Sequence, residues 1–303
     1  MIQPPKLKVK DKAVIISPAG FIEKELITAT AQILQNWGLD VDISSNALHK
    51  VGRFSGTVEE RLSDLQNAID DANTKLIFCS RGGYGIAHLL DKLDFTGLKN
   101  NPKWIIGYSD ITALHSALQV NGVMSLHAPM AKHFYDEGSS DTSVIHTRSI
   151  LEGYDLEYTI KAEEDSHLNK KGIAKGNLFG GNLAVMCGLL GTKYSYIPQG
   201  GILFIEDIGE EPYKIDRFIH QLKLAGVFSK ISGLVIGQFS DYKEDPLMYS
   251  SLYQSISNIL GEYTFPICFN FPVGHVKDNM PMIVGKDATL IVKDNYITFK
   301  QKI

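Results

Sequence analysis

Ser109 lies in a segment whose residue types are suited to nucleophilic catalysis. Three apolar residues, a glycine and the serine follow one another in Trp104-Ile105-Ile106-Gly107-Tyr108-Ser109-Asp110, and a helix-like stretch comes next. This order predicts a strand, a sharp turn and a helix. Such a turn places the serine hydroxyl at a helix N-terminus, where free N–H groups favour developing negative charge. The corresponding chemistry is attack of an activated serine on a carbonyl carbon.

A serine hydroxyl is a poor nucleophile until a base takes its proton, and the base needs an acid that orients it. Of the nine histidines, His275 stands out because it follows Pro272 and Gly274 in a predicted loop. Loops carry functional residues more often than regular elements do. His275 is therefore the candidate base, although a merely exposed loop histidine has the same signature. His115, on the helix after Ser109, is expected to be a packing residue.

Glu206 is the candidate for the orienting acid. It ends an apolar run, 201–205, which predicts a buried strand. A carboxylate at the end of such a strand is costly unless it is paired or functional. A cap or salt bridge at the strand end is the alternative. Asp207, Glu210 and Glu211 compete for the same role, and the last two stand before a predicted helix, whose N-terminus favours acidic residues.

A second glycine-rich turn offers the donors that a tetrahedral intermediate needs for its oxyanion. The turn is Ser80-Arg81-Gly82-Gly83-Tyr84-Gly85, between a predicted strand and a predicted helix. Its backbone could bring an N–H group close to the serine, with the N–H of Asp110 as the second donor. Arg81 could bind a substrate carboxylate through two hydrogen bonds, and a structural salt bridge is the alternative.

The elements that position these residues alternate along the first half of the chain. Strands are predicted at 13–17, 41–43, 75–79 and 104–106, and helices at 24–37, 58–73, 84–93 and 110–120. Such alternation is typical of βαβ units and a mostly parallel sheet. Ligands of these sheets bind beyond the carboxyl ends of the strands, and both glycine-rich turns fall at that edge.

The pattern changes at residues 149–172, which are rich in charged residues and poor in helical periodicity. We expect a linker there, with an extended piece at 156–160. Strands are then predicted at 201–205, 233–237 and 289–292, and a helix at 212–224. The predicted organisation is one α/β domain at 1–148, the linker at 149–172, and a second domain of mixed sheet character at 173–303.

The composition excludes several classes of protein. The chain has 303 residues, 44% of them hydrophobic, and a net charge of −4. It lacks the clustered basic face of nucleic-acid-binding proteins and any apolar run long enough for a membrane span or signal-peptide core. Cys79, Cys187 and Cys268 stand in apolar surroundings without a Cys-x-x-Cys motif, as expected of buried free thiols. We therefore expect a cytoplasmic protein with neither nucleic acid nor membrane as a partner.

Four motifs, in this order, resemble the L,D-carboxypeptidase family of serine peptidases. They are Ser80-Arg81-Gly82-Gly83-Tyr84-Gly85, Gly107-Tyr108-Ser109-Asp110, Phe204-Ile205-Glu206-Asp207-Ile208-Gly209-Glu210-Glu211-Pro212-Tyr213 and Pro272-Val273-Gly274-His275. The resemblance spans nearly the whole chain, from Ser17-Pro18-Ala19-Gly20 to the region of Gly285. This family includes muramoyltetrapeptide carboxypeptidases and microcin C self-immunity peptidases.

The resemblance implies a catalytic triad in which Ser109 is the nucleophile, His275 the base and Glu206 the orienting acid. It implies that the N–H groups of Gly83 and Asp110 form the oxyanion hole, and that neither a metal nor another cofactor is needed. The implied fold is α/β, with a Rossmann-like N-terminal domain, a mostly parallel sheet and a smaller, swivelling C-terminal β/α domain. The implied assembly is a homodimer with the site between the two domains.

The activity implied by the resemblance is that of a serine carboxypeptidase with a small peptide substrate. It would cleave the L,D bond before the terminal D-alanine of cytoplasmic murein tetrapeptide, during peptidoglycan recycling. The reaction would pass through an acyl-enzyme, with the oxyanion donors each contributing about 3–4 kcal/mol.

Two departures from the family pattern bear on the substrate. Val276 stands where a glycine usually follows the histidine, and Ala128 replaces the glycine of a common His-Gly-Pro-Met segment. Neither departure touches the triad, but both could reshape the pocket. Hydrolysis of peptidyl- or aminoacyl-nucleotides, as in microcin C self-immunity, is therefore the alternative activity. That activity needs an aromatic platform for the base, and neither Trp37 nor Trp104 is an obvious one.

A nucleotide-binding protein is the alternative from another class. The segment Gly83-Tyr84-Gly85-Ile86-Ala87-His88 follows a predicted strand and imitates the Gly-x-Gly-x-x-Gly motif. His88 stands where the third glycine would allow close packing between helix and strand. This mismatch disfavours the nucleotide-binding interpretation.

Overall fold

The computed structural model describes residues 1–161 and 164–303. Contacts divide the chain into two compact units. The first comprises Met1–Tyr154, Met280–Gly285 and Ile303, and the second comprises Asp155–Asn279 and Lys286–Lys302. Each unit is built on one sheet.

The first unit contains a six-stranded sheet in the order β11-β5-β4-β3-β1-β2. Its strands are β1 (Lys12–Ile16), β2 (Asp40–Ile43), β3 (Thr74–Cys79), β4 (Trp104–Gly107), β5 (Ser125–His127) and β11 (Met282–Val284). All pairs are parallel except β11 with β5. The apolar runs of β1, β3 and β4 are buried on both faces, as expected of the central strands of a covered parallel sheet.

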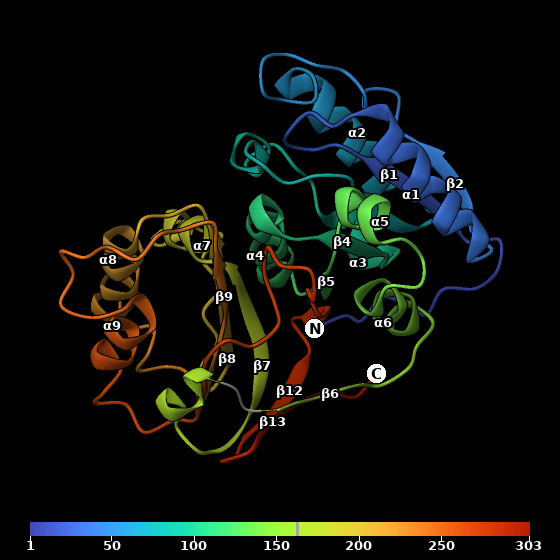
Figure 1. Cartoon of the computed structure of the whole chain (residues 1–303). Coiled ribbons are helices and arrows are strands. Elements are labelled where there is room, and N and C mark those ends of the chain that lie inside the picture. The colour runs from blue at the N-terminus through green and yellow to red at the C-terminus, as the bar shows by residue number, and fades with distance from the viewer. Residues whose placement is uncertain (162–163) are drawn as a thin grey trace. The chain divides into compact units, whose positions relative to one another are not determined.

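Helices cover this sheet (Figure 1). They are α1 (Lys24–Asn36), α2 (Val58–Asp70), α3 (Thr96–Asn100), α4 (Thr112–Val120), α5 (Ala131–Glu137) and α6 (Thr142–Leu151), together with the short 3₁₀ turns η1 (Ile86–His88) and η2 (Ser109–Ile111). Helix α2 begins at a capping box in which the Thr57 hydroxyl accepts from the Glu60 N–H and the Glu60 carboxylate accepts from the Thr57 N–H. The alternation predicted from the sequence is thus confirmed.

The second unit contains a seven-stranded mixed sheet in the order β10-β9-β8-β7-β12-β13-β6. Its strands are β6 (Leu156–Lys161), β7 (Gly172–Asn182), β8 (Ile202–Ile208), β9 (Gly233–Ser240), β10 (Ile267–Cys268), β12 (Asp287–Val292) and β13 (Tyr296–Gln301). Strands β7 to β10 are parallel, and the remaining pairs are antiparallel.

Three helices pack on one face of the parallel half of this second sheet, as Figure 1 shows for α8 and α9 beside β8 and β9. They are α7 (Leu183–Leu189), α8 (Pro212–Leu224) and α9 (Leu252–Ile259), and a 3₁₀ turn, η3, spans Glu164–Leu168. Ile215, Ile219 and Leu222 line the buried stripe of α8 and join a core cluster with strand residues such as Leu203 and Ile236. Pro212 opens α8 at its first turn, as predicted.

The structure differs from the sequence predictions in three places. The helix expected at 84–93 is only the short turn η1, because Gly83 and Gly85 both adopt positive φ angles, +90° and +144°, that interrupt the helical pattern. The segment 149–172, expected to be a linker, contains the end of α6 at Leu151, while the extended piece expected at 156–160 is β6, which pairs with β13. Residues 282–284, placed with the second domain from sequence, form β11 in the first sheet.

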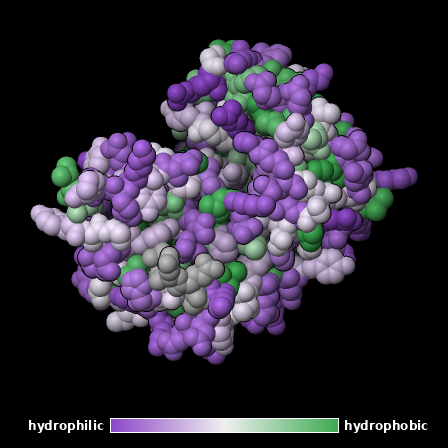
Figure 2. Space-filling view, viewed as in Figure 1, coloured by the Kyte–Doolittle hydropathy of each residue, from purple (hydrophilic) through white to green (hydrophobic). Residues whose placement is uncertain are grey.

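The surface seen in Figure 2 is mostly hydrophilic, with hydrophobic residues in small separate spots. Single exposed apolar residues are ordinary on folded domains. No helix in the described part of the chain is both long and apolar enough to cross a membrane. The three cysteines are buried and free, as predicted.

Candidate active site

Ser109 sits at the sharp turn between β4 and α4, where the sequence predicted it. Its φ angle is +63°, a left-handed conformation that is strained for a residue with a side chain. Gly107 makes the turn possible, since a Cβ at that position would lie 2.8 Å from Cγ1 of Ile111. Strain of this kind concentrates at functional sites and holds a side chain in one direction.

Gly82, in the other glycine-rich turn, lies directly against Ser109. A Cβ built on Gly82 would lie 2.9 Å from the Ser109 Cβ and 3.1 Å from both the Ser109 Oγ and the Asp110 backbone nitrogen. The structure thus brings the two turns together at the carboxyl edge of the first sheet. The space beside Gly82 is within reach of both the hydroxyl and a backbone donor, which is where a reacting carbonyl must sit.

The backbone N–H groups of Gly83 and Asp110 are the donors proposed for an oxyanion. Neither donates a hydrogen bond to another residue within the ranges the structure describes. The Asp110 side chain is buried and serves the turn instead: its Oδ2 accepts from the Ile86 N–H at 2.9 Å. Burial raises the pKa of Asp110, while hydrogen bonds from the Ile86 and Gly85 N–H groups act in the opposite direction.

His115 is a buried core residue, as predicted, but it also supports the turn that carries Ser109. Its Nε2 donates to the Gly107 carbonyl at 2.8 Å, so that its Nδ1 accepts from the Ser125 hydroxyl at 2.8 Å. Complete burial lowers the pKa of His115 to about 4. The ring is therefore neutral at ordinary pH and holds the end of β4 in place.

Arg81 lies at the same edge and is exposed. Its Nη1 donates to the Phe21 carbonyl at 2.5 Å. No described carboxylate forms an ion pair with it, so the salt bridge considered from the sequence is not formed within the described ranges. The other guanidinium nitrogens can still bind an incoming anion.

The second unit brings Glu206 and His275 together. Glu206, near the end of β8, is fully buried, and its Oε2 accepts from the His275 Nδ1 at 2.7 Å. This bond fixes the tautomer and leaves Nε2 as the basic nitrogen. The other oxygen, Oε1, is buried and has no hydrogen-bond partner among the described residues. A buried carboxylate bound to histidine is the arrangement expected of an orienting acid.

The backbone around His275 is shaped to allow this contact. Gly274 has a φ angle of +132°, and a Cβ on it would lie 3.0 Å from the Glu206 Cβ and 3.1 Å from Oε2. Only glycine therefore fits between the loop and the acid. The loop is held by the Gly274 N–H, which donates to the buried Asn279 Oδ1 at 3.0 Å, and by the Gln238 N–H, which donates to the Val273 carbonyl at 3.0 Å.

Asp207, which competed with Glu206 in the sequence, has a different position. Its carboxylate accepts from Asn182 Nδ2 at 2.8 Å, from the Ala184 N–H at 2.8 Å and from the Ile208 N–H at 2.9 Å. These bonds tie the end of β8 to the start of α7. Burial, and to a lesser degree the nearby charge of Glu206, raises the pKa of Asp207 to about 6. The hydrogen bonds of Asp207 therefore stabilise the end of β8.

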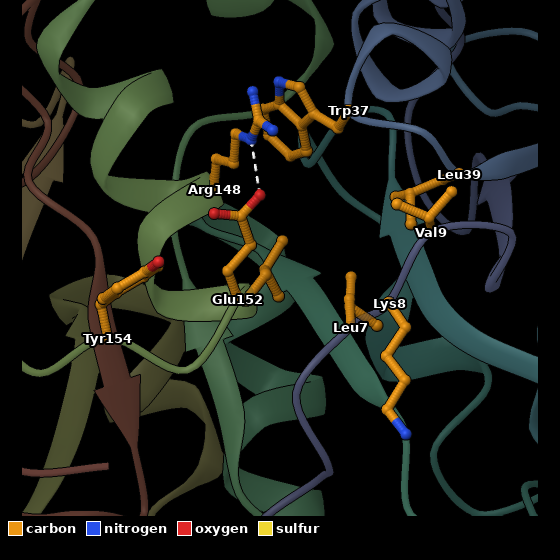
Figure 3. Close-up of a pocket in the computed structure, with 9 residues that line it drawn as sticks. Leu7, Lys8, Val9, Trp37, Leu39, Arg148, Glu152 and Tyr154 are labelled. Carbon is orange, nitrogen blue, oxygen red and sulfur yellow. Dashed lines mark hydrogen bonds and ion pairs between the residues drawn. The ribbon is translucent and has the colours of Figure 1, made fainter.

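A pocket of about 280 Å³ lies elsewhere in the first unit (Figure 3). Its walls come from the segment before β1, from α6 and from the loop before β2, and they include Leu7, Trp37, Leu39 and Arg148. Arg148 Nε binds Glu152 Oε1 at 2.7 Å across one side of the pocket (Figure 3). These walls belong to the amino ends of the strands, so the pocket is separate from the serine turn.

Sequence reasoning missed Arg61 and the contact of Gly82 with Ser109. Arg61 is a buried arginine on α2 that hydrogen-bonds the carbonyl oxygens of Pro18 and Gly85. Its signal was available, because Arg61, Leu65 and Ala68 share one helix face at spacings of four and three. The Gly82 contact had no local signal, since it joins two loops distant in sequence.

Within residues 1–161 and 164–303, no three His, Cys, Asp or Glu side chains gather as metal ligands would.

Family models match both halves of the chain. The model described as the LD-carboxypeptidase N-terminal domain matches residues 14–128. The model described as the LD-carboxypeptidase C-terminal domain matches residues 175–290. The first range contains the serine turn and the second contains the Glu206–His275 pair.

Individual proteins are similar to this chain over nearly the whole length of both sequences. A murein tetrapeptide carboxypeptidase of Pseudomonas aeruginosa is 31% identical, covering 93% of this chain and 94% of the relative. A probable murein peptide carboxypeptidase of Bacillus subtilis is 31% identical, covering 95% and 91%. The crystal structure of a muramoyltetrapeptide carboxypeptidase from Oxalobacter formigenes superposes with a TM-score of 0.87 at 28% identity, covering 96% of this chain and 99% of that one.

Proposed function

Because the chain belongs to the LD-carboxypeptidase family, we propose that it is a serine carboxypeptidase that removes the terminal D-alanine of murein tetrapeptide. Relatives that cover more than nine-tenths of the chain are named for murein peptides. The observation that carries the proposal is the hydrogen bond of 2.7 Å between the fully buried Glu206 and His275. It supplies a histidine base of defined tautomer, which a serine nucleophile requires.

In the proposed reaction Ser109, His275 and Glu206 act as one triad. His275 Nε2 takes the proton of the Ser109 hydroxyl as Oγ attacks the carbonyl carbon before the terminal D-alanine. Glu206 stabilises the imidazolium that forms. His275 then gives the proton to the departing amine of D-alanine, which leaves an acyl-enzyme on Ser109. A water molecule, deprotonated by the same imidazole, attacks the ester and restores the free serine.

The proposed oxyanion hole consists of the N–H groups of Gly83 and Asp110. The negative charge develops on the substrate carbonyl oxygen during attack, and a fixed N–H donor stabilises it more than it stabilises the neutral carbonyl. Two observations support the assignment. Both N–H groups lack an acceptor among the described residues. A Cβ built on Gly82 would lie 3.1 Å from the Asp110 backbone nitrogen, so the space beside Gly82 is within reach of that donor.

We propose that Arg81 binds the free carboxylate of the terminal residue. A carboxypeptidase must recognise that group, and Arg81 is an exposed guanidinium beside the glycine-rich turn. Replacement Arg81→Met is expected to raise KM about 10-fold or more with a smaller change in kcat, because the interaction exists before the reaction begins. An unchanged KM for the tetrapeptide would rule out this role.

The test of the proposed activity is release of D-alanine from a murein tetrapeptide by the wild type and three variants. Ser109→Ala and His275→Ala are expected to lower kcat by about 10⁵–10⁶-fold, and Glu206→Gln by about 10⁴-fold. Ser63→Ala and His220→Ala are matched controls on exposed helix faces. If the three variants turn over like the wild type, the triad assignment is wrong.

A second substrate decides between the two activities considered from sequence. The same proteins are incubated with an aminoacyl sulfamoyl adenylate. We expect the wild type to release D-alanine and to leave this nucleotide intact. Cleavage of the nucleotide with an intact tetrapeptide would instead assign the chain to nucleotide-linked substrates.

We also propose that the enzyme is a homodimer, as the family resemblance implies. Sedimentation equilibrium at several protein concentrations measures the mass directly. A monomer mass throughout would contradict the proposal without bearing on the triad.

A further inference from the structure

We propose that Arg61 and the Asp110 carboxylate are positioning residues that grip the Gly85–Ile86 peptide group from both sides. In doing so they hold the glycine-rich turn 81–85 with the Gly83 N–H ready for the oxyanion. The inference rests on the proposed function for its catalytic consequence. Its structural part, the grip itself, stands on contacts within the first unit.

Arg61 holds the carbonyl side of this peptide group. Its side chain extends from α2, is only 2% exposed, and donates from Nη1 to the Gly85 and Pro18 carbonyl oxygens, each at 3.0 Å. No described carboxylate lies within ion-pair distance of it. A buried guanidinium without a carboxylate partner is costly unless its donors are used. The two carbonyl contacts use Nη1, whereas the buried Nε has no hydrogen-bond partner among the described residues.

Asp110 holds the amide side of the same group. Its Oδ2 accepts from the Ile86 N–H at 2.9 Å, and the carboxylate is only 5% exposed. Because Asp110 follows Ser109 directly, the grip connects the glycine-rich turn to the nucleophile itself.

The two contacts together fix the orientation of one peptide plane. The Gly85 carbonyl and the Ile86 N–H belong to a single planar unit. Rotating that unit by half a turn would point its oxygen at the Asp110 carboxylate and its N–H at the Arg61 guanidinium. Both interactions would then be unfavourable, so the charge pair selects one orientation.

This selection matters because the turn is otherwise adaptable. Gly83 and Gly85 have φ angles of +90° and +144°, and glycines move between such conformations easily. The start of the turn is fixed by the Gly20 N–H, which donates to the Gly82 carbonyl at 2.8 Å. Gly83 lies between this bond and the Arg61–Asp110 grip. With both ends held, its N–H keeps one direction before substrate arrives, and such preorganisation is the source of oxyanion-hole catalysis.

The contacts leave no room for a side chain at Gly85. A Cβ there would lie 2.5 Å from the Arg61 Nη1. The other groups that face Arg61 are His88, whose Nδ1 lies 3.4 Å from Nη2, and the ring of Phe54, 5.0 Å from the guanidinium carbon. The Glu59 charge also acts on Arg61, more weakly than that of Asp110. The His88 backbone N–H also donates to the Gly85 carbonyl, at 3.1 Å, and so supports the same orientation of the peptide group as Arg61 does.

The test compares Arg61→Met, Arg61→Lys and Asp110→Asn with the wild type, with the exposed Arg53→Met as the matched control. One readout is the kcat and KM for D-alanine release. The other is amide hydrogen exchange at Gly82–Ile86, compared with exchange in β1 and β3. Arg61→Met is expected to lower kcat about 100-fold, the loss typical of one oxyanion donor, with KM changed less than about 3-fold.

Exchange of the Ile86 amide in Arg61→Met is expected to rise at least about 10-fold, while β1 and β3 keep wild-type protection. Arg61→Lys should recover part of kcat, because an ammonium can still donate to the Gly85 carbonyl. Asp110→Asn keeps an acceptor for the Ile86 N–H but loses the charge, so we expect a smaller loss than in Arg61→Met. The Arg53→Met control should match the wild type in both readouts.

Three results would overturn the inference. Unchanged exchange at Gly82–Ile86 in Arg61→Met would show that no grip exists. Faster exchange throughout β1 and β3 would show that Arg61 supports the fold as a whole. Faster exchange in the turn alone with wild-type kcat would show that the grip has no catalytic role. If the wild type itself released no D-alanine, the proposed function would fail, and hydrogen exchange would still decide whether the grip exists.

Discussion

Single glycine and serine positions define the geometry of the proposed nucleophile. Ser109 adopts a left-handed backbone conformation, and Gly82 approaches it closely enough that a Cβ would meet its hydroxyl. Gly274 plays the corresponding part beside Glu206 in the second unit. At Gly82 and Gly274 the absence of a side chain leaves room beside Ser109 and Glu206. Replacing either glycine by alanine therefore tests whether that room is needed for activity.

Gly82→Ala is expected to lower kcat by about 100-fold or more, because its Cβ would occupy the space beside the Ser109 Oγ where the reacting carbonyl must sit. The matched control is Gly188→Ala, an exposed helical position with no heavy atom within 4 Å of the added Cβ. The control should keep its activity and gain about 1 kcal/mol in stability from helix propensity. Steady-state kinetics and urea unfolding measure both effects, and a fully active Gly82→Ala would contradict the placement of the carbonyl.

At the scale of elements, α2 is fastened at both ends by buried cations. Arg61, in its first turn, binds the carbonyl groups of two loops at the site. Beyond its last turn, the fully buried Lys103 donates from Nζ to the carbonyl oxygens of Ala68, Ile69 and Asp71. Lys170 caps the C-terminal end of α9 in the second unit in the same way, through Leu260 and its neighbours. Cations suit the positions of Lys103 and Lys170 because helix C-termini carry partial negative charge, whereas Arg61 at the N-terminal end of α2 binds carbonyl groups of other segments.

Lys103→Met is expected to lower the free energy of unfolding by about 2–4 kcal/mol, since it leaves buried carbonyl groups without their donor. The exposed Lys99→Met should change it by less than about 0.5 kcal/mol. Urea titration followed by circular dichroism gives both values. Equal stability of the two variants would mean that water replaces the Lys103 donors at little cost.

At the scale of the whole molecule, each unit builds its own part of the chemistry. The first unit holds Ser109 and the proposed oxyanion donors, and the second holds the Glu206–His275 pair. The stability of each unit can therefore limit activity on its own. The first unit contains a pH-sensitive group in its core, the neutral His115.

Stability of the first unit is expected to fall as the pH drops from about 6.5 to 4. The pKa of His115 is lowered to about 4 by burial, whereas an unfolded histidine has a pKa of about 6.5. In this window the unfolded chain binds a proton that the folded chain does not, so acid favours unfolding. The loss in free energy of unfolding reaches about 3 kcal/mol at pH 4, and above pH 6.5 His115 causes no loss.

His115→Asn should flatten this dependence, measured as urea midpoints between pH 7.5 and 4.5. The dependence will not vanish entirely, because burial also lowers the pKa of His146. The exposed His220→Asn serves as the control and should retain the wild-type slope. A wild-type slope in His115→Asn would assign the acid sensitivity to other groups.

Local sequence patterns were sufficient for much of the fold. The periodic segment at 212–224 is the helix α8, and the alternation of the first half is a mostly parallel sheet. The segment 84–93, predicted to be a helix, contains only the short turn η1. The Gly85–Ile86 peptide group at its start hydrogen-bonds to Arg61 and Asp110, which come from distant parts of the chain. Residues 282–284 join the first sheet through pairing with β5, a contact that no local pattern encodes.

The sequence by itself determined the chemical inventory of this protein: Ser109 on a strand–turn–helix, a carboxylate ending an apolar strand, a loop histidine, and the order of motifs that identifies the family. These are local properties of residue type and spacing. Only the tertiary structure decided that Glu206 rather than Asp207 binds His275, that Gly82 lies against Ser109, and that Arg61 and Asp110 hold one peptide group between them. Those outcomes depend on distances between segments far apart along the chain, which packing and strand register set.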